Sequence, residues 1–167
     1  MNFSFDNYFV RQMELKDLKN IVSNAKDPEI ANNNTVVKKY NSSAKAKKYI
    51  EKMQNKEINK EGYELVIEDS NYNFVGVLSL HHMDYTKGTG YIGYWLTKEN
   101  WGKGIITMAL SHLLPFAFNY LGLKKLYAKT LITNQKSQRV LERAGFKIVG
   151  KGGKTQEEYY FYELTKN

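Results

Sequence analysis

The chain has 167 residues, of which 42% are hydrophobic and 25% are charged. This length and composition predict one globular domain, residues 1–167, with a single sizeable core. The chain has no cysteine, which excludes a disulfide scaffold, a cysteine metal site and a thiol nucleophile. Residues 1–6 lack a leader pattern, and no apolar run approaches the roughly 20 residues that span a bilayer. We therefore expect a cytoplasmic protein with no membrane partner.

The net charge of +8 is concentrated in residues 38–61, which hold eight lysines and three glutamates. A solvated helix face is the simpler interpretation of such a run. The alternative is a surface that attracts a polyanionic partner, which would be a nucleotide cofactor, an acidic protein or ribosomal RNA. The candidate contacts for that partner are Lys45, Lys47 and Lys48.

In the first half of the chain, hydrophobic periodicity predicts three strands and two helices. The first helix ends before Pro28, because the residue that precedes a proline avoids the helical conformation. The second helix begins at an N-cap supplied by Ser42 or Ser43. In chain order, the predicted elements are a strand at Tyr8–Met13, a helix at Leu15–Ala25, a helix from Ser42 to about Ile58, and strands at Tyr63–Glu68 and Phe74–His82.

The second half of the chain predicts four strands and two helices. Pro115 should kink the longer helix or end it early, and Gly122 and Gly145 are helix-stop candidates. These elements are a strand at Tyr91–Thr97, a helix at Ile105–Tyr120, a strand at Lys125–Thr133, a helix at Asn134–Ala144, and strands at Phe146–Val149 and Tyr159–Leu164. The fold class is α+β, with about four helices and a mixed, mostly antiparallel sheet of seven strands that contains one parallel strand–helix–strand unit.

That parallel unit predicts an anion site. The helices that follow its two strands both begin at one edge of the sheet, where unpaired N–H groups and a partial positive charge favour a phosphate. A turn with Gly102 and Gly104 leads into the first of these helices, and glycine lets backbone approach a pyrophosphate. The spacing matches neither a Walker A loop nor a dinucleotide fingerprint. A plain tight turn remains the alternative.

Few side chains in the sequence suggest catalysis. Asn134 and Ser137 are first of all a helix start, although the amide could hold a cofactor and the hydroxyl could donate a proton. His81 and His82 are adjacent in a strand and should face opposite ways, which favours a packing or surface role. His112 lies within a helix. No serine-hydrolase or zinc-protease motif occurs, so a hydrolase and a metal site have no support.

Three segments together resemble the GNAT superfamily of N-acetyltransferases, and within it the branch of ribosomal-protein N-terminal (RimJ/RimL-type) acetyltransferases. The order of the elements over residues 8–165 also fits that fold. The three segments are Gly90-Tyr91-Ile92-Gly93-Tyr94-Trp95-Leu96, Trp101-Gly102-Lys103-Gly104-Ile105-Ile106-Thr107 and Asn134-Gln135-Lys136-Ser137-Gln138-Arg139-Val140-Leu141-Glu142-Arg143-Ala144-Gly145-Phe146.

The resemblance implies acetyl-coenzyme A (acetyl-CoA) as the acetyl donor, with direct transfer to an amine and no acyl-enzyme. The pantetheine arm of the donor would lie beside Tyr94, Trp95 and Leu96, and Asn134 would contact that arm. The pyrophosphate would lie on the backbone amides of the glycine turn and the following helix, namely those of Gly102, Lys103, Gly104, Ile105, Ile106 and Thr107.

The catalytic groups depart from the family pattern. Many relatives protonate the leaving thiolate with a tyrosine seven residues after the asparagine, but this chain has Leu141 there. Ser137 matches the serine of the ribosomal-type branch and is the expected proton donor. The branch also carries a glutamate where this chain has Tyr91, which leaves the general base open. Its candidates are Glu157 and Glu158, for which a solvated turn is the alternative, and His82.

The acceptor is an amine that must lose a proton. An α-amino group, with a pKa near 8, needs less help than a lysine near 10.4, so the expected acceptor is a protein N-terminus of the ribosomal-protein type. A small amine such as a polyamine or aminoglycoside is the alternative acceptor. Two other classes of function remain open, a non-catalytic acetyl-CoA sensor and a basic nucleic-acid-binding domain. The oligomeric state is not indicated.

Overall fold

The computed structural model describes residues 1–155 and 157–166. Eight strands form one mixed sheet in the hydrogen-bonded order β1-β2-β3-β4-β5-β6-β8-β7. The chain divides into two compact units, the first made of residues 1–79 and 94–101 and the second of the remaining residues. Strands β4 (Phe74–Asp84) and β5 (Thr89–Leu96) each contribute residues to both units.

The first unit contains the first three strands and most of the helices. β1 (Phe3–Phe5) pairs with β2 (Tyr8–Gln12), and β2 pairs with β3 (Tyr63–Asp69), both in antiparallel register. Its helical elements are the 3-10 turn η1 (Leu15–Asp17), α1 (Leu18–Lys26), α2 (Pro28–Asn33), the 3-10 turn η2 (Val37–Tyr40), α3 (Ser43–Ile58) and the 3-10 turn η3 (Lys98–Asn100).

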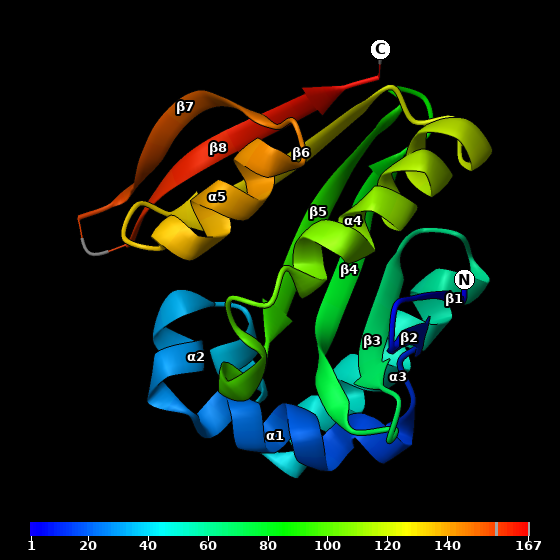
Figure 1. Ribbon diagram of the computed structural model, residues 1–167, viewed down its shortest axis with the longest axis vertical. Coiled ribbons are helices and arrows are strands. Elements are labelled where there is room, and N and C mark those ends of the chain that lie inside the picture. The colour runs from blue at the N-terminus through cyan, green and yellow to red at the C-terminus, as the bar shows by residue number, and fades with distance from the viewer. Residues whose placement is uncertain (156, 167) are drawn as a thin grey trace. The chain divides into compact units, whose positions relative to one another are not determined.

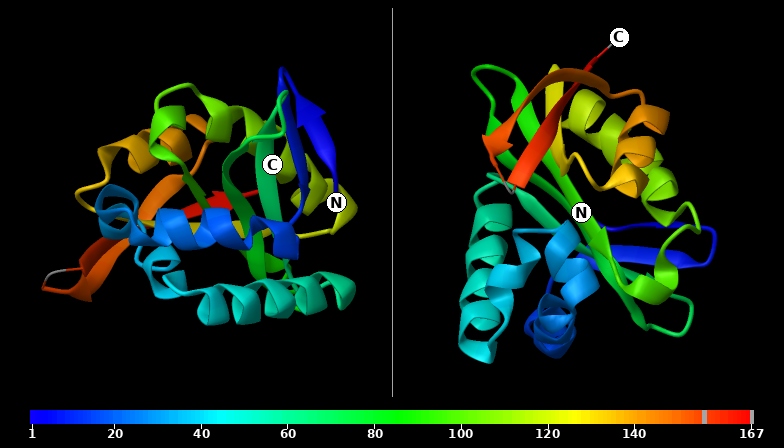
Figure 2. Two further views of the ribbon diagram at one scale, coloured as in Figure 1. Left: turned by 90° about the horizontal axis from the view of Figure 1, so that it is seen from below. Right: turned by 90° about the vertical axis from the view of Figure 1, so that its left-hand side faces the viewer.

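The core of the first unit lies between its strands and the neighbouring helices α1 and α3, which run side by side (Figure 2). The helix α3 contributes the predicted apolar stripe, with Ala46 and Ile50 both 0% exposed. The predicted N-cap is confirmed as Ser42, whose side chain accepts a hydrogen bond from the backbone N–H of Lys45. The buried residues of this hydrophobic cluster are Met13, Ile21, Ala46, Ile50, Val66 and Val77.

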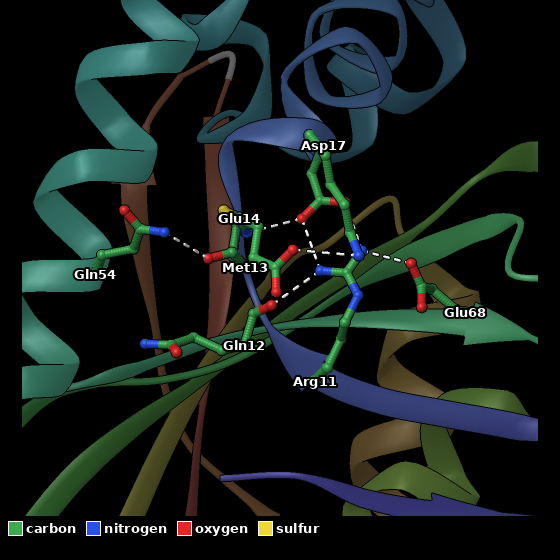
Figure 3. Close-up of polar contacts among 8 residues, drawn as sticks. Arg11, Gln12, Met13, Glu14, Asp17, Gln54 and Glu68 are labelled. Atoms are coloured by element: carbon green, nitrogen blue, oxygen red, sulfur yellow. Dashed lines mark hydrogen bonds and ion pairs between the residues drawn. The ribbon is translucent and has the colours of Figure 1, made fainter.

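An ion-pair network ties β2 and β3 to the start of the helical segment (Figure 3). The guanidinium group of Arg11 donates to both carboxylate oxygens of Asp17, at 2.9 and 2.7 Å, and also to Glu68. Burial lowers the pKa of Arg11, but the bonds to the two carboxylates outweigh it and raise the pKa above its ordinary value. Removing Arg11 would leave two buried negative charges unpaired, which is strongly destabilising.

A third buried carboxylate, Glu64, has no arginine partner in the described residues. It accepts a hydrogen bond from the hydroxyl of Tyr49 at 2.5 Å, and the ring of Tyr49 stacks on Tyr40 with centroids 3.9 Å apart. Burial raises the pKa of Glu64 to about 7, against smaller lowering effects of Tyr49 and Lys56. Burial therefore favours the protonated form of Glu64, and the attraction of Lys56 opposes it only in part.

The second unit holds the predicted parallel strand–helix–strand arrangement. Two of its helices are preceded by the strands β5 and β6, and α5 lies along β6 and the hairpin of β7 and β8 (Figure 1). Its elements, besides parts of β4 and β5, are α4 (Ile105–Pro115), the π-helical turn η4 (Phe116–Tyr120), β6 (Lys125–Leu131), α5 (Gln135–Arg143), β7 (Lys147–Lys154) and β8 (Glu157–Thr165).

Helix breakers act where the sequence places them. α4 ends at Pro115 and its last turn widens into the π-helical segment η4, which avoids the hydrogen bond that the proline cannot donate. Gly122 and Gly145 both take positive φ values, 72° and 89°, as expected of residues that follow a helix C-terminus.

The strands β5 and β6 pair over only three residues. Their parallel register joins Thr89 to Lys125, Gly90 to Leu126 and Tyr91 to Tyr127. β6 continues to Leu131 and stays paired with β8 along its whole length, from Lys125↔Thr165 to Leu131↔Tyr159. The pairing of β5 with β6 therefore ends at Tyr91↔Tyr127, while the pairing of β6 with β8 continues.

Two elements were not predicted. The eighth strand is β1, whose three residues are too few for a period-two signal. The additional helix is α2, which begins at Pro28, where the sequence predicts only the end of the preceding helix. Pro28 takes its first turn, and the carboxylate of Asp27 caps it by accepting from the N–H groups of Glu29 and Ile30. A proline in the first turn begins a helix as readily as it ends one. No helix in the described residues is long and apolar enough to cross a membrane.

The state of Glu64 predicts a pH-dependent stability. Its folded pKa of about 7 exceeds the ordinary value of 4.5, so the folded chain keeps a proton that the unfolded chain releases. The free energy of unfolding should therefore fall by about 3 kcal/mol between about pH 4.5 and pH 7, and this contribution should then level off. Glu64→Gln should remove that contribution and raise stability at pH 8, as measured by urea unfolding from pH 4.5 to 8.

Exposed Glu61 supplies the control. Glu61→Gln should leave the difference between the two pH extremes as it is in the unsubstituted chain. If Glu64→Gln and the unsubstituted chain have parallel stability curves, Glu64 is ionised in the folded state and the interpretation is wrong.

Candidate cofactor-binding and catalytic site

The conformation of the glycine turn before α4 fits both a phosphate site and a plain tight turn. Gly102 and Gly104 have φ values of 77° and 75°, in the left-handed region that favours glycine. A Cβ added at either position would meet no protein atom within 4 Å. The protein itself therefore leaves the space beside this backbone open, and only conformation demands glycine at the two positions.

The first turn of α4 presents backbone donors without an internal partner. Gly104 is the N-cap but has no capping side chain, and the first helical bond runs from the N–H of Met108 to the carbonyl of Gly104. The N–H groups of Ile105, Ile106 and Thr107 precede that bond. The hydroxyl of Thr107 is buried and makes no hydrogen bond within the described residues. Such a group, beside a positive helix end, fits a phosphate oxygen.

The second helix start, at α5, is capped as predicted. The side-chain oxygen of Asn134 accepts from the N–H of Ser137 at 3.1 Å. The amide of Gln138 fastens the turn by donating to the carbonyls of Leu131 and Ile132, at 3.3 and 2.9 Å. Asn134 and Ser137 are both half-buried, and Asn134 lies three residues after the end of β6. The role as a helix start is confirmed, while roles in cofactor contact and proton donation stay predictions.

The expected pantetheine neighbours Tyr94, Trp95 and Leu96 belong to the first unit. The carbonyl of Tyr94 accepts from the side chain of Asn34 at 3.4 Å, and that of Leu96 accepts from the indole N–H of Trp101 at 3.0 Å. Trp95 packs its ring against Phe74, with centroids 5.6 Å apart. Their role toward a cofactor stays a prediction.

The glutamate candidates for the base are engaged with their own hairpin. Glu158 forms an ion pair with Lys151 at 3.2 Å, and Glu157 accepts from the hydroxyl of Tyr159 at 3.4 Å. Glu158 is an even-numbered residue of β8 and shares the sheet face of Tyr162, which is 0% exposed. The base role of either glutamate stays a prediction.

The strand pattern predicts that His81 and His82 face opposite ways, but in the structure they do not. His82 has a positive φ of 48°, which breaks the alternation of β4. Both imidazole rings consequently approach Tyr91, with His81 stacked at a centroid distance of 6.1 Å and His82 edge-on at 6.0 Å. The sequence does not indicate this positive φ, because position 82 holds neither glycine nor asparagine, the residues that adopt it most readily.

Tyr91 and Tyr127 were missed as site candidates. Their rings lie 5.2 Å apart, at the last pair of residues before β5 and β6 part. Knowing the strand register would have placed them together, but a sequence does not reveal the register of a parallel pair. Leu141, where relatives place a tyrosine, is buried to 1% exposure in α5 and only packs. No three metal-ligating side chains converge in the parts of the chain that the structure describes.

The uncapped helix start and the glycine turn before α4 form a candidate site for an anionic ligand in the second unit. The chain belongs to the acetyltransferase (GNAT) domain family, whose model matches residues 8–147.

Individual proteins with similar sequences or structures are also acetyltransferases by name. YdaF of Bacillus subtilis (strain 168), provisionally named a ribosomal N-acetyltransferase, is 43% identical over 76 residues, which are 46% of this chain and 42% of YdaF. The match thus spans less than half the length of that relative. The ribosomal-protein-S5-alanine acetyltransferase of Vibrio fischeri superposes with a TM-score of 0.85 at 21% identity, covering 99% of this chain and 96% of its own.

A third protein shares the fold but has another acceptor in its name. It is the spermidine N-acetyltransferase of Vibrio cholerae, solved in complex with CoA and spermine. It has a TM-score of 0.79 and 20% identity, and the alignment covers 95% of each chain. At these identities, the two solved structures show the fold of this chain and leave its acceptor undecided.

Proposed function

We propose that the protein is an acetyl-CoA-dependent N-acetyltransferase that transfers acetyl directly to a primary amine. The observation that carries this proposal is the start of α4, where an uncapped helix and a buried, unpartnered Thr107 hydroxyl follow two left-handed glycines. In a chain of the GNAT family, that arrangement suits the pyrophosphate of acetyl-CoA, the family's acetyl donor.

The residues present fit the diphosphate. The N–H groups of Ile105, Ile106 and Thr107 point out of the helix start, and the glycine turn adds backbone amides with no Cβ between them and a ligand. The Thr107 hydroxyl offers one further hydrogen bond. Bound at this point, acetyl-CoA supplies the activated acetyl group, and the protein binds and orients it.

The transfer needs two proton movements. The acceptor enters as an ammonium and loses one proton, which leaves the nitrogen lone pair free to attack the thioester carbonyl carbon. As the carbon–nitrogen bond forms, the carbon–sulfur bond breaks, and the nitrogen loses its second proton while the thiolate gains one. Ser137, half-buried in the first turn of α5, is the proposed donor to the thiolate.

For the acceptor, a protein N-terminal α-amine fits better than a polyamine. The α-amine is the weaker base, so less help is needed to deprotonate it. The chain carries a net charge of +8, which repels a polycation such as spermidine and tolerates a peptide with one positive charge. YdaF, which is provisionally named a ribosomal N-acetyltransferase, agrees with this choice.

The first prediction tests the diphosphate site with a matched pair of glycines. Gly104 and Gly122 have φ values of 75° and 72°, and a Cβ on either would meet nothing within 4 Å. Each change to alanine should therefore cost a similar 1–2 kcal/mol, roughly, of stability. Only Gly104→Ala should weaken acetyl-CoA binding, by about tenfold or more, because its Cβ enters the space of the ligand.

Calorimetric titration with acetyl-CoA, together with urea unfolding, measures both effects. Equal affinities in the two variants would place the diphosphate away from the start of α4 and contradict the proposal.

A further prediction concerns the proton donor. Ser137→Ala should lower kcat by roughly 10- to 1000-fold and leave acetyl-CoA affinity almost unchanged, because the hydroxyl acts only as the thiolate departs. The helix start should survive, since Asn134 bonds to the backbone N–H of Ser137 and not to its hydroxyl. Ser111→Ala, at an exposed serine of α4, is the control. Full kcat in Ser137→Ala would mean that water or another group protonates the thiolate.

The lysines of α3 predict a salt-dependent acceptor preference. Lys45 and Lys47 hold only exposed contacts, with Asn41 at 3.2 Å and Glu51 at 3.8 Å. If α3 attracts an acidic acceptor protein, changing Lys45, Lys47 and Lys48 to glutamate should raise KM for that protein. The effect should fade as salt approaches roughly 1 M, where the screening length is about 3 Å.

Changing Lys16, Lys19 and Lys26 to glutamate alters the net charge equally at another exposed surface and serves as the control. Equal responses of the two triple variants, or no dependence on salt, would make the α3 lysines a solubility feature.

A further inference from the structure

One cluster of aromatic side chains in the second unit, two of them exposed and two half-buried, is not explained by cofactor binding. It consists of His81 and His82 on β4, Tyr91 on β5 and Tyr127 on β6. Their rings form a continuous set, in which His81 and His82 lie 4.9 Å apart, both lie about 6 Å from Tyr91, and Tyr91 lies 5.2 Å from Tyr127. Tyr91 is 42% exposed, so the cluster borders solvent and does not serve as core.

All four rings lie on one face of the sheet. A Cβ on Gly90 would contact Leu80, Leu123 and Leu126, and Ile92 is 5% exposed, so the even-numbered residues of β5 face the apolar interior. Tyr91 must face the other way. Its register partner Tyr127 shares that face, because paired residues of neighbouring strands project to the same side.

The cluster depends on backbone strain. A regular strand would turn His82 back toward the interior, but its positive φ of 48° brings the ring to Tyr91 instead. A residue that is not glycine keeps such a conformation only when its surroundings impose it, and such residues concentrate at functional sites. The strain therefore points to a use for the exposed rings.

The position of the cluster relates it to the reaction. Tyr91 and Tyr127 are the last paired residues before β5 and β6 part, and β6 leads from Tyr127 to the start of α5 with Asn134 and Ser137. The cluster thus lies at the end of the paired segment, from which β6 runs on toward the start of α5. An acceptor amine that reaches a thioester beside β6 from this face of the sheet passes the rings.

A cation already occupies one of these ring faces. The ammonium of Lys125 lies 6.0 Å from the ring centroid of Tyr127 and is paired with Glu163 at 2.9 Å. Farther along the same face, Lys129 lies 4.6 Å from the ring centroid of Tyr159. Ring faces carry negative potential and attract ammonium groups, and this face of β6 uses that attraction twice.

We propose that His81, His82, Tyr91 and Tyr127 form the acceptor site and hold the ammonium of a peptide N-terminus against their ring faces. The inference rests on the proposed acetyltransferase function. Lys125 and Lys129 border the site, so an acceptor with several positive charges is repelled and one with a single α-ammonium is favoured.

The test measures how well the enzyme distinguishes a charged from a neutral N-terminus. A short peptide with a free α-amine and the same peptide with an acetylated N-terminus are titrated in the presence of CoA. The protein should bind the free amine more tightly. Tyr91→Leu should weaken binding of the free amine about 5- to 20-fold, raise KM similarly, and leave binding of the acetylated peptide almost unchanged.

Two further variants separate recognition from packing. Tyr91→Phe restores the ring and should recover the preference that Tyr91→Leu loses. His82→Gly accepts the positive φ without strain and removes a ring, so KM for the peptide should rise while the melting temperature does not fall. Tyr120→Leu, which changes a 77% exposed tyrosine of η4, is the control and should leave both peptide affinities unchanged.

An unchanged preference in Tyr91→Leu, in a variant that still binds acetyl-CoA, would overturn this inference and leave the acetyltransferase proposal intact. Failure of the unsubstituted protein to bind acetyl-CoA would instead refute the proposed function, and the acceptor site would fall with it.

Discussion

The candidate site depends on the parting of two parallel strands. β5 and β6 exchange hydrogen bonds over three residue pairs, and β6 then continues with only β8 as its partner. Because α4 connects the two strands in a parallel crossover, α4 and α5 both begin at the edge where the strands have separated. Two helix N-termini with unpaired N–H groups therefore belong to the second unit, and such groups suit an anionic ligand.

Several residues of the second unit adopt the left-handed backbone conformation. Gly102 and Gly104 adopt left-handed conformations before α4, and His82 adopts one beside Tyr91. The two glycines take that conformation at little cost, but the histidine does not, and a buried hydroxyl without a partner at Thr107 adds a further cost. Two of these costs have no structural benefit in the described residues. A bound diphosphate would relieve one, and an acceptor amine held by the rings would make use of the other.

The buried carboxylates of the first unit are stabilised in two different ways. Arg11 pairs with Asp17 and Glu68 through direct hydrogen bonds. Glu64 meets only the hydroxyl of Tyr49 and responds by holding its proton to about pH 7. In the strand register Arg11 lies opposite Val66, midway between Glu64 and Glu68, and its guanidinium group bonds to Glu68.

The sequence by itself determined the features that depend on neighbouring residues. Pro115 ends α4, Ser42 and Asn134 cap their helices, and two glycines shape the turn before α4, because each effect acts within one turn of chain. The family and the start of α4 as a candidate diphosphate site could be predicted from these signals. Only the tertiary structure decided which distant side chains meet, as the cluster around Tyr91 shows. The register of parallel strands and the reversed ring of His82 are set by packing between residues far apart in the chain, and local periodicity carries no record of either.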